Sequence, residues 1–393
     1  MKIAVIGGSI AGCTIASILQ KRFNVTVFER AKNLKSRGTG ITMAPSLMKT
    51  LVDKKLIDEN IVTYPASTRK FYCKDPAKPQ IGRCIWNQDI DVLGLHWDEL
   101  YSNLRKRVSN EIYKSGVTVE NVLLKNNNAS EIRLDNGDVL KFDLVIFSDG
   151  INSIGRPLLS PNSMLEYSGY VAWRGVVDFN KIKDKTPFIN NIPYFCFDNG
   201  HLLAYAVNHG GKKQLNWVFY EHISLEQLDA LGQTGYNDFS HSATEHMHKL
   251  AIKKLPANIA QLVIDTPTPF MQKISDVSVK CSANYGAVLL GDASIVLRPH
   301  VGNGASLAIS DAITLGDRLL SNNNADTAIA QWQEDQLPER IQMYNLSKRM
   351  GENLVLNTPS WQEKNKLSMD SWWKEIIQDD RWYTNTNSQS PGR

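Results

Sequence analysis

The sequence predicts an α/β protein in which a parallel, Rossmann-type nucleotide-binding sheet carries an inserted antiparallel (α+β) sheet, with helices at the C-terminus. Three observations predict this fold. The apolar run Ile3-Ala4-Val5-Ile6 leads into glycines and a helix, and a second strand-like run ends at Glu29; this order indicates parallel strands. Buried-strand patterns recur near residues 144–150 and 286–320. Between them, an aromatic-rich β pattern favours antiparallel pairing.

The elements follow in order along the chain. A small-residue helix is expected from Ala11 to Arg22, and the turn Asp135-Asn136-Gly137-Asp138 predicts a hairpin before the apolar strand Leu144–Phe147. An amphipathic helix is expected after Gly304, because apolar residues there recur at helical spacing. The aromatic strands are expected at 170–177, 194–197, 201–207 and 215–220, with helices over 225–263 and a strand at 287–290.

These patterns divide the chain into three parts. The nucleotide-binding domain is expected to be discontinuous, because its strands are separated by the aromatic sheet, which would serve as a substrate platform. The expected ranges are 1–68, 95–160 and 276–320 for the nucleotide-binding domain, 69–94 and 161–275 for the substrate sheet, and 321–393 for a helical segment with a polar tail.

Composition limits the class of protein. A chain of 393 residues with 42% hydrophobic and 21% charged residues is typical of a globular protein with more than one core. The net charge of +4 is scattered, which argues against nucleic-acid binding. Five cysteines without C-x-x-C spacing favour a reduced, cytoplasmic protein, and no apolar run reaches membrane-spanning length. We expect a monomer or homodimer.

The first glycine turn resembles a G-x-G-x-x-G motif, with Ser9 in place of the second glycine. Gly7 would form the tight turn and Gly12 would let helix and strand pack closely, while the Ile10 and Ala11 amides face an anion. The Ser9 hydroxyl can itself donate to a phosphate. A carboxylate at Glu29, with Arg30 beside it, would accept from ribose hydroxyls. The alternative is a glycine turn used for packing alone.

Two further turns follow predicted strands. Asp149-Gly150 precedes Arg156, and Gly291-Asp292 precedes the loop from Pro299 to Gly304. Each alone is also compatible with an ordinary strand–loop connection. A nicotinamide enzyme needs only the first turn, so three turns suit a larger cofactor held along its length. The additional candidate cofactor-binding residues are Asp149, Arg156, Asp292, Pro299, Gly302, Asn303 and Gly304.

The three turns together resemble those of the single-component (class A) flavoprotein aromatic hydroxylases, the superfamily of para-hydroxybenzoate hydroxylase. Residues 148–156 match the family's A-D-G-x-x-S-x-x-R motif, 288–293 its Gly-Asp motif, and Pro299, Gly302 and Gly304 its P-x-x-G-x-G motif. The stretches 7–10, 169–175 and 296–300 favour the 2,6-dihydroxypyridine hydroxylase-like branch. Ile295 and Trp97 depart from the family, where a histidine and an FAD-contacting arginine are usual.

The resemblance implies a tightly bound FAD that is reduced by transient NADPH or NADH. It also implies reaction with O2 through a flavin hydroperoxide and hydroxylation of a small aromatic or N-heterocyclic substrate. Two alternatives stay open. The substrate could be larger and polycyclic, such as a tetracycline-like compound, or the chain could be a non-catalytic redox sensor that binds flavin or NAD.

Candidate substrate-site residues come from strand alternation and from the third turn. His201 and Tyr205 share one face of a strand, as do Trp217 and Phe219 on the next. The candidate catalytic residues are His300, His201 and Tyr205, and the candidate substrate contacts are Trp217, Arg174 and Phe219. The alternatives are core packing for Tyr205 and Trp217, surface exposure for His201, and an ion pair for Arg174.

No metal site is expected. His241, Glu245, His246 and His248 lie close together in the sequence, and His241 and Glu245 would share a helical face. A metal site needs three or four converging ligands, and no matching set occurs elsewhere in the chain.

Overall fold

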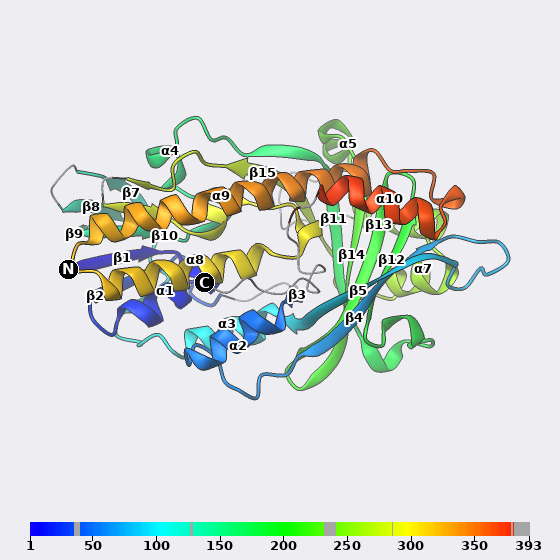
Figure 1. The fold of residues 1–393 in the computed structure, drawn as a ribbon, viewed down its shortest axis with the longest axis horizontal. Helices are drawn as coiled ribbons and strands as arrows, with labels where there is room; N and C mark the ends of the chain where they lie inside the picture. The colour runs from blue at the N-terminus through cyan, green and yellow to red at the C-terminus, as the bar shows by residue number, and fades with distance from the viewer. Residues whose placement is uncertain (35–39, 126–128, 232–240, 285, 379, 381–393) are drawn as a thin grey trace.

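The computed structural model describes residues 1–34, 40–125, 129–231, 241–284, 286–378 and 380. Figure 1 shows a mostly parallel sheet with its helices at one end of an elongated molecule and a large, mostly antiparallel sheet at the other. The predicted fold class is confirmed: parallel and antiparallel sheets and C-terminal helices are all present. Within these residues, no helix is both long and apolar enough to cross a bilayer.

The first sheet has six strands in the order β16-β17-β10-β1-β2-β6. Its central strand, β1, pairs in parallel with β10 on one side and β2 on the other. β10 is apolar and buried at all four positions, as expected for a strand covered on both faces. The strand bounds are β1 (Lys2–Ile6), β2 (Asn24–Glu29), β6 (Tyr113–Ser115), β10 (Leu144–Phe147), β16 (Ala283–Asn284) and β17 (Ala287–Leu289).

The two faces of this sheet are covered differently. Ile3, Val5 and Ile146 pack in one core with helices α1 and α8, whereas Ala4 and Val145 on the opposite face pack against a three-stranded sheet. The helices on the first face are α1 (Ile10–Leu19), α2 (Pro45–Asp53), α3 (Trp97–Arg105) and α8 (Gly304–Ser321). The small sheet consists of β7 (Val119–Leu123), β8 (Ser130–Leu134) and β9 (Val139–Phe142), and β8 and β9 form the predicted hairpin.

The second sheet has nine strands in the order β18-β15-β11-β14-β13-β12-β4-β5-β3. One face packs against helices α6 and α7, and the other faces the cavity described below and the C-terminal helices. The strands are β3 (Gly40–Met43), β4 (Tyr64–Cys73), β5 (Arg83–His96), β11 (Glu166–Asp178), β12 (Asn191–Phe197), β13 (Gly200–His209), β14 (Lys212–His222), β15 (Phe270–Ser278) and β18 (Ile295–Val296). The remaining short helices are α4 (Arg156–Leu159), α5 (Leu225–Ala230), α6 (His241–Lys254) and α7 (Ala257–Ile264).

The C-terminal helices connect the two sheets. Helix α9 (Ala325–Gly351) runs along the molecule from the first sheet to the second (Figure 1). It is joined to α8 by the buried pair Arg340–Asp311, with a nitrogen–oxygen distance of 2.7 Å. A π-helical turn (Glu352–Leu356) follows, and α10 (Lys366–Ile377) then packs Trp372 and Trp373 against the second sheet. Trp382 and the predicted polar tail lie outside the described residues.

The sheet boundaries differ from the predicted domain ranges. β3 and β18 lie in ranges expected for the nucleotide-binding domain, yet both pair into the nine-stranded sheet. The β4–β5 hairpin also starts at Tyr64 and ends at His96, which is longer than the 69–94 range. Strand pairing between distant segments sets these boundaries, and local sequence patterns do not report it.

A partly buried ion pair on the outer face of the large sheet gives a pH-dependent prediction. His246 Nε2 lies 2.7 Å from Glu221 Oε1, and this hydrogen bond raises the pKa of His246. The pair therefore stabilises the fold fully below about pH 6.5, and this contribution is lost as the pH rises through the raised pKa. We expect His246→Gln to lower Tm by about 1–2 °C more at pH 6 than at pH 9, measured by thermal unfolding. An equal loss at both pH values would contradict this assignment.

Candidate active site

A cavity of about 480 Å³ lies between the two sheets. Residues of both sheets line it, so neither sheet forms the site alone. The first sheet and its helices contribute Ser9, Ile10, Ala11, Ser148, Gly150, Ile151, Leu290, Asp292, Gly304, Ala305 and Ala308. The second sheet contributes Arg174, Ile192, Tyr194, Leu203, Tyr205, Val218, Tyr220 and Lys273, and the loop between β18 and α8 contributes Pro299, His300, Gly302 and Asn303.

Two helix N-termini open onto this cavity. Helix α1 begins after Ser9 and helix α8 begins after Asn303, and neither capping residue makes a side-chain cap hydrogen bond. Neither helix has an acidic residue in its first turn. The first amide groups of a helix lack intrahelical partners and carry a partial positive charge, so both ends of the cavity suit an anionic group.

Close packing explains the glycines of the first turn. Gly7 has a φ of +94°, and a Cβ there would lie 2.4 Å from the Ser148 carbonyl oxygen. A Cβ on Gly12 would lie 1.9 Å from the Gly7 oxygen. The strand ends of β1 and β10 therefore approach as closely as backbone allows. Gly7 and Gly12 shape the turn without lining the cavity, whereas Ser9, Ile10 and Ala11 line it.

Glu29 is held against the first turn. Its two carboxylate oxygens accept hydrogen bonds from the backbone amides of Gly8 and Ala31, each at 2.8 Å. Tyr113 covers the same turn and donates its hydroxyl to the Gly8 oxygen at 2.9 Å. Sequence analysis did not identify Tyr113, because it is 105 residues away in the chain.

A second cavity, of about 240 Å³, lies just beyond Glu29. Tyr101, Arg105, Tyr113 and residues 31–34 line it together with Ser115. Arg30 is exposed and lines neither cavity. Any contact of Arg30 with a cofactor would therefore need a different side-chain position.

Arg156 joins the second and third turns. Its Nη1 donates to the Ile151 oxygen at 2.8 Å, and its Nη2 donates to the Asp292 oxygen at 2.8 Å. The side chain is buried and does not line the cavity. Asp149 accepts from the Ile154 amide at 2.8 Å, and burial raises its pKa. Arg156 thus positions the two turns, while the Asp292 side chain is exposed and lines the cavity.

The loop before helix α8 is fixed by a buried ion pair that sequence analysis did not find. Arg298 Nη2 lies 2.6 Å from Asp276 Oδ2, and both side chains are 5% exposed. The Arg298 amide also donates to Ser347 Oγ of α9. The loop is therefore fixed relative to β15 and α9. His300 lies in this loop, two residues after Arg298.

His300 lies on the cavity wall and is almost completely buried. Its Nε2 lies 2.9 Å from the hydroxyl of Tyr170, and Nδ1 has no hydrogen-bond partner among the described residues. Burial, together with the charges of His201, Arg298 and Arg174, lowers the pKa of His300 well below its usual value. His300 is therefore neutral at pH 7.

His201 does not line the cavity, so its predicted catalytic contact with substrate is corrected. The ring is fully buried behind Tyr220 and His300, with ring centroids 4.8 and 5.3 Å away. Its Nδ1 donates to the Leu354 carbonyl oxygen at 3.2 Å, because a carbonyl can only accept. Burial lowers the pKa of His201 to about 3, so this histidine is a neutral packing residue behind the wall.

The substrate predictions for strand β14 were made for the wrong face. Leu203 pairs with Val218, and Tyr205 pairs with Asn216, so the even-numbered residues of β14 share the cavity face. Trp217 and Phe219 point to the opposite face and are fully buried there. Trp217 donates its indole nitrogen to Thr266 Oγ1 at 2.9 Å. On β14, Tyr220 lines the cavity where Trp217 and Phe219 were expected, although sequence analysis did not select it. Tyr205 on β13 lines the cavity as expected.

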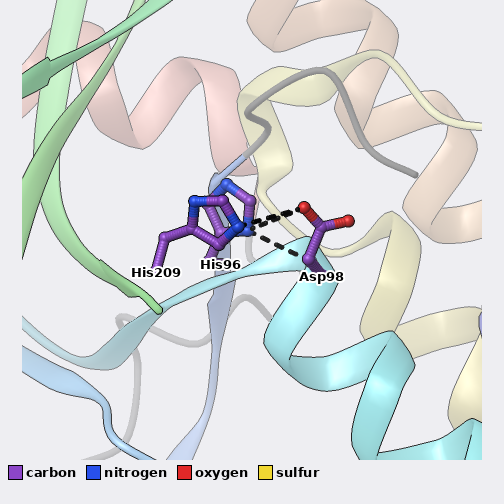
Figure 2. A group of neighbouring side chains, drawn as sticks. All are labelled: His96, Asp98 and His209. Atoms are coloured by element: carbon purple, nitrogen blue, oxygen red, sulfur yellow. Dashed lines mark hydrogen bonds and ion pairs between the residues drawn. The ribbon is translucent and has the colours of Figure 1, made fainter. Parts of the chain in front are cut away.

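A group of two histidines and an aspartate lies at the start of α3 (Figure 2). His96 Nδ1 accepts from the Asp98 amide at 3.2 Å, and His209 Nε2 lies 3.4 Å from Asp98 Oδ2. Although their ligand atoms lie within 4.8 Å of one another, the imidazole rings are stacked at 15°. The nitrogen lone pairs of stacked imidazole rings lie in parallel planes, whereas a metal ion needs lone pairs that converge on one point. We therefore assign the group a structural role between α3 and the β13–β14 hairpin.

The residues around the large cavity fit an FAD molecule. The cavity is continuous from the uncapped N-terminus of α1 to that of α8. The first terminus suits a pyrophosphate, the exposed Asp292 carboxylate suits polyol hydroxyls, and the second terminus suits the charge of a reduced flavin ring. The small residues Gly302 and Gly304 leave backbone exposed where the ring would lie.

Comparisons with known proteins agree with this geometry. A family model described as "FAD binding domain-like" matches residues 167–276. The chain is 26% identical over 375 residues to the 2,6-dihydroxypyridine 3-monooxygenase of Paenarthrobacter nicotinovorans, covering 90% of this chain and 91% of that protein. It is 25% identical over 377 residues to the 6-hydroxynicotinate 3-monooxygenase of Pseudomonas fluorescens, covering 92% and 94%. The solved 2,6-dihydroxypyridine-3-hydroxylase of Arthrobacter nicotinovorans superposes with a TM-score of 0.83 at 25% identity, covering 91% of this chain and 93% of that chain.

The fold, the cavity and these relatives define a flavoprotein monooxygenase. Within that class, the chain is similar to the single-component, FAD-dependent aromatic hydroxylases of the 2,6-dihydroxypyridine hydroxylase-like branch. The family resemblance carried by the three turns is thereby confirmed.

The Arg298–Asp276 pair gives a prediction about stability. Asp276→Asn leaves the buried Arg298 guanidinium without its counter-charge, which costs about 3–5 kcal/mol. We expect a lower Tm and weaker FAD retention, because the His300 loop loses its anchor. The double variant Asp276→Asn/Arg298→Gln should recover part of the lost Tm, measured by calorimetry. An Asp276→Asn variant as stable as the parent would show that the pair does not hold the loop.

Proposed function

We propose that this protein binds FAD in the large cavity and uses NADPH or NADH and O2 to hydroxylate a small aromatic or N-heterocyclic ring. One observation carries the proposal: a single cavity joins two uncapped helix N-termini to a wall of aromatic residues and a neutral histidine. The names of the two relatives support an N-heterocyclic ring, since they specify a dihydroxypyridine and a hydroxynicotinate as substrates of those proteins.

The cofactor would be held along its whole length. We assign the pyrophosphate to Ser9, Ile10 and Ala11 at the start of α1, and the polyol chain to Asp292. The flavin ring would lie against Pro299, Gly302, Asn303 and Gly304, all of which line the cavity. Gly7, Gly12, Glu29, Asp149 and Arg156 would act indirectly, by fixing the shape of the turns.

When bound and reduced, FAD would supply the chemistry that activates O2 for transfer to the ring. The protein has to orient the ring, exclude water and accept a proton from a ring hydroxyl, because a deprotonated ring is more electron-rich. We assign the proton step to His300, because it lies on the cavity wall and is oriented by the Tyr170 hydroxyl. Tyr194, Tyr205 and Tyr220 provide flat, largely apolar walls for the ring.

The first test is cofactor binding. The purified protein should be yellow, with flavin absorbance that is lost on unfolding, and Asp292→Ala should lower FAD affinity by about tenfold because a carboxylate–hydroxyl contact is removed. Phe219→Leu is a matched control, because it changes the opposite face of the sheet. A colourless protein that does not bind added FAD would overturn the proposed function.

The second test is turnover. Hydroxypyridines and hydroxybenzoates should accelerate NAD(P)H oxidation with a hydroxylated product, detected by mass spectrometry. His300→Gln should lower kcat/KM by about 100-fold while FAD absorbance is retained, because the proton acceptor is lost. A protein that holds FAD but shows no ligand-stimulated oxidation would instead fit the redox-sensor alternative.

A further inference from the structure

We propose that Arg174 binds a carboxylate group of the substrate, so that the ring hydroxylated by this enzyme carries a negative charge. The inference rests on the proposed function, which it deepens by naming the charge of the substrate.

Arg174 lies on an interior strand of the large sheet, on its cavity face. Its strand, β11, pairs with β14 on one side and β15 on the other, placing Arg174 opposite Val218 and Phe270. The side chain is 8% exposed and lines the cavity. Its position is therefore fixed by strands on both sides, and its charged group is directed into a space that a ligand can occupy.

No carboxylate of the described chain pairs with this arginine. No ion pair or hydrogen bond joins Arg174 to an acidic residue in the described ranges, and its Nε is enclosed without an acceptor. The buried arginines Arg298 and Arg340 differ, since each lies within 2.7 Å of a buried aspartate oxygen. Burying an unpaired cation is costly, and a bound anion offsets this cost.

The cavity around Arg174 is electropositive. Asp292 is the one carboxylate among the described lining residues, and it lies at the end of the other sheet, beside helix α8. Lys273 lines the cavity as a further cation, whereas Arg298 is neutralised by Asp276. Tyr220 and His300, whose pKa values Arg174 affects by charge, are both neutral groups. An anion bound at Arg174 therefore meets no carboxylate of the described cavity wall other than Asp292.

The chemistry of the guanidinium selects the kind of anion. A guanidinium presents paired N–H donors in one plane, which matches the two oxygens of a carboxylate. His300 lines the same cavity, and the charge of Arg174 contributes to the lowered pKa of its ring. A ring held by its carboxylate at Arg174 would thus have a neutral proton acceptor beside it, as the proposed hydroxylation requires.

Binding to the holoenzyme tests the proposal with compounds that differ by one carboxylate. The pairs are 6-hydroxynicotinate with 2-hydroxypyridine, and 4-hydroxybenzoate with phenol, titrated by the change in flavin absorbance. We expect the parent protein to bind a carboxylated compound at least about tenfold more tightly than its partner. Arg174→Gln should reduce this preference to within about twofold. A parent protein without the preference, or with no binding of either carboxylate, overturns the proposal, as does an Arg174→Gln variant that keeps it.

Thermal stability gives a readout that needs no substrate. Arg174→Gln removes an uncompensated buried charge, so the ligand-free holoenzyme should keep or raise its Tm. Arg340→Gln is the matched contrast, because it strands the buried Asp311 carboxylate and should lower Tm. If Arg174→Gln lowers Tm as much as Arg340→Gln does, then Arg174 has a partner within the protein and the proposal is overturned.

Two further measurements distinguish a carboxylate site at Arg174 from an effect of Arg174 on the flavin and from a failure of the proposed function. FAD affinity and the flavin reduction potential should be unchanged in Arg174→Gln without substrate; a shift in either would assign the charge to the flavin and overturn the proposal. Equal stimulation of NAD(P)H oxidation by phenol and by 4-hydroxybenzoate would overturn the inference and leave the proposed function standing. Failure to bind FAD at all would instead overturn the proposed function.

Discussion

The close approach of β1 and β10 is the constraint on which the site depends. The two strands are parallel neighbours, and the hydroxyl of Ser148 donates to the Gly7 oxygen at 2.7 Å. Because parallel strands end at the same edge of a sheet, this contact places the first and second turns side by side. β17 pairs with β10 on its other side and delivers the third turn to the same edge. Arg156 then joins the second turn to the third through backbone oxygens.

Local motifs in the sequence were sufficient to predict the three turns at this edge of the first sheet. Gly7, Gly12, Asp149 and Asp292 each belong to a short strand–turn pattern whose shape depends on neighbouring residues. The contacts that orient the cavity wall are different in kind. Asp276 pairs with Arg298 across 22 residues, Tyr113 reaches Gly8 across 105, and Tyr170 reaches His300 across 130. No local pattern reports such partners, so these three residues were not predicted.

The error at Trp217 and Phe219 has a related cause. Alternation along β14 divides its residues into two faces, but it does not say which face meets the cavity. Pairing of Leu203 with Val218 decides that question, and it follows from the length of the turn between β13 and β14. Both faces are rich in aromatic residues, so composition does not distinguish the wall of a cavity from the core behind it.

The order of the strands also bears on how the chain folds during synthesis. β17 and helix α8 complete the first sheet, yet they follow most of the nine-stranded sheet in the sequence. The outer edge of β10 therefore stays unpaired until about residue 289 has left the ribosome. Such long-range pairing slows folding and leaves a sheet edge open to wrong partners in the meantime. The nucleotide-binding end, although it starts the chain, therefore waits for strands that are made only after eight of the nine strands of the other sheet.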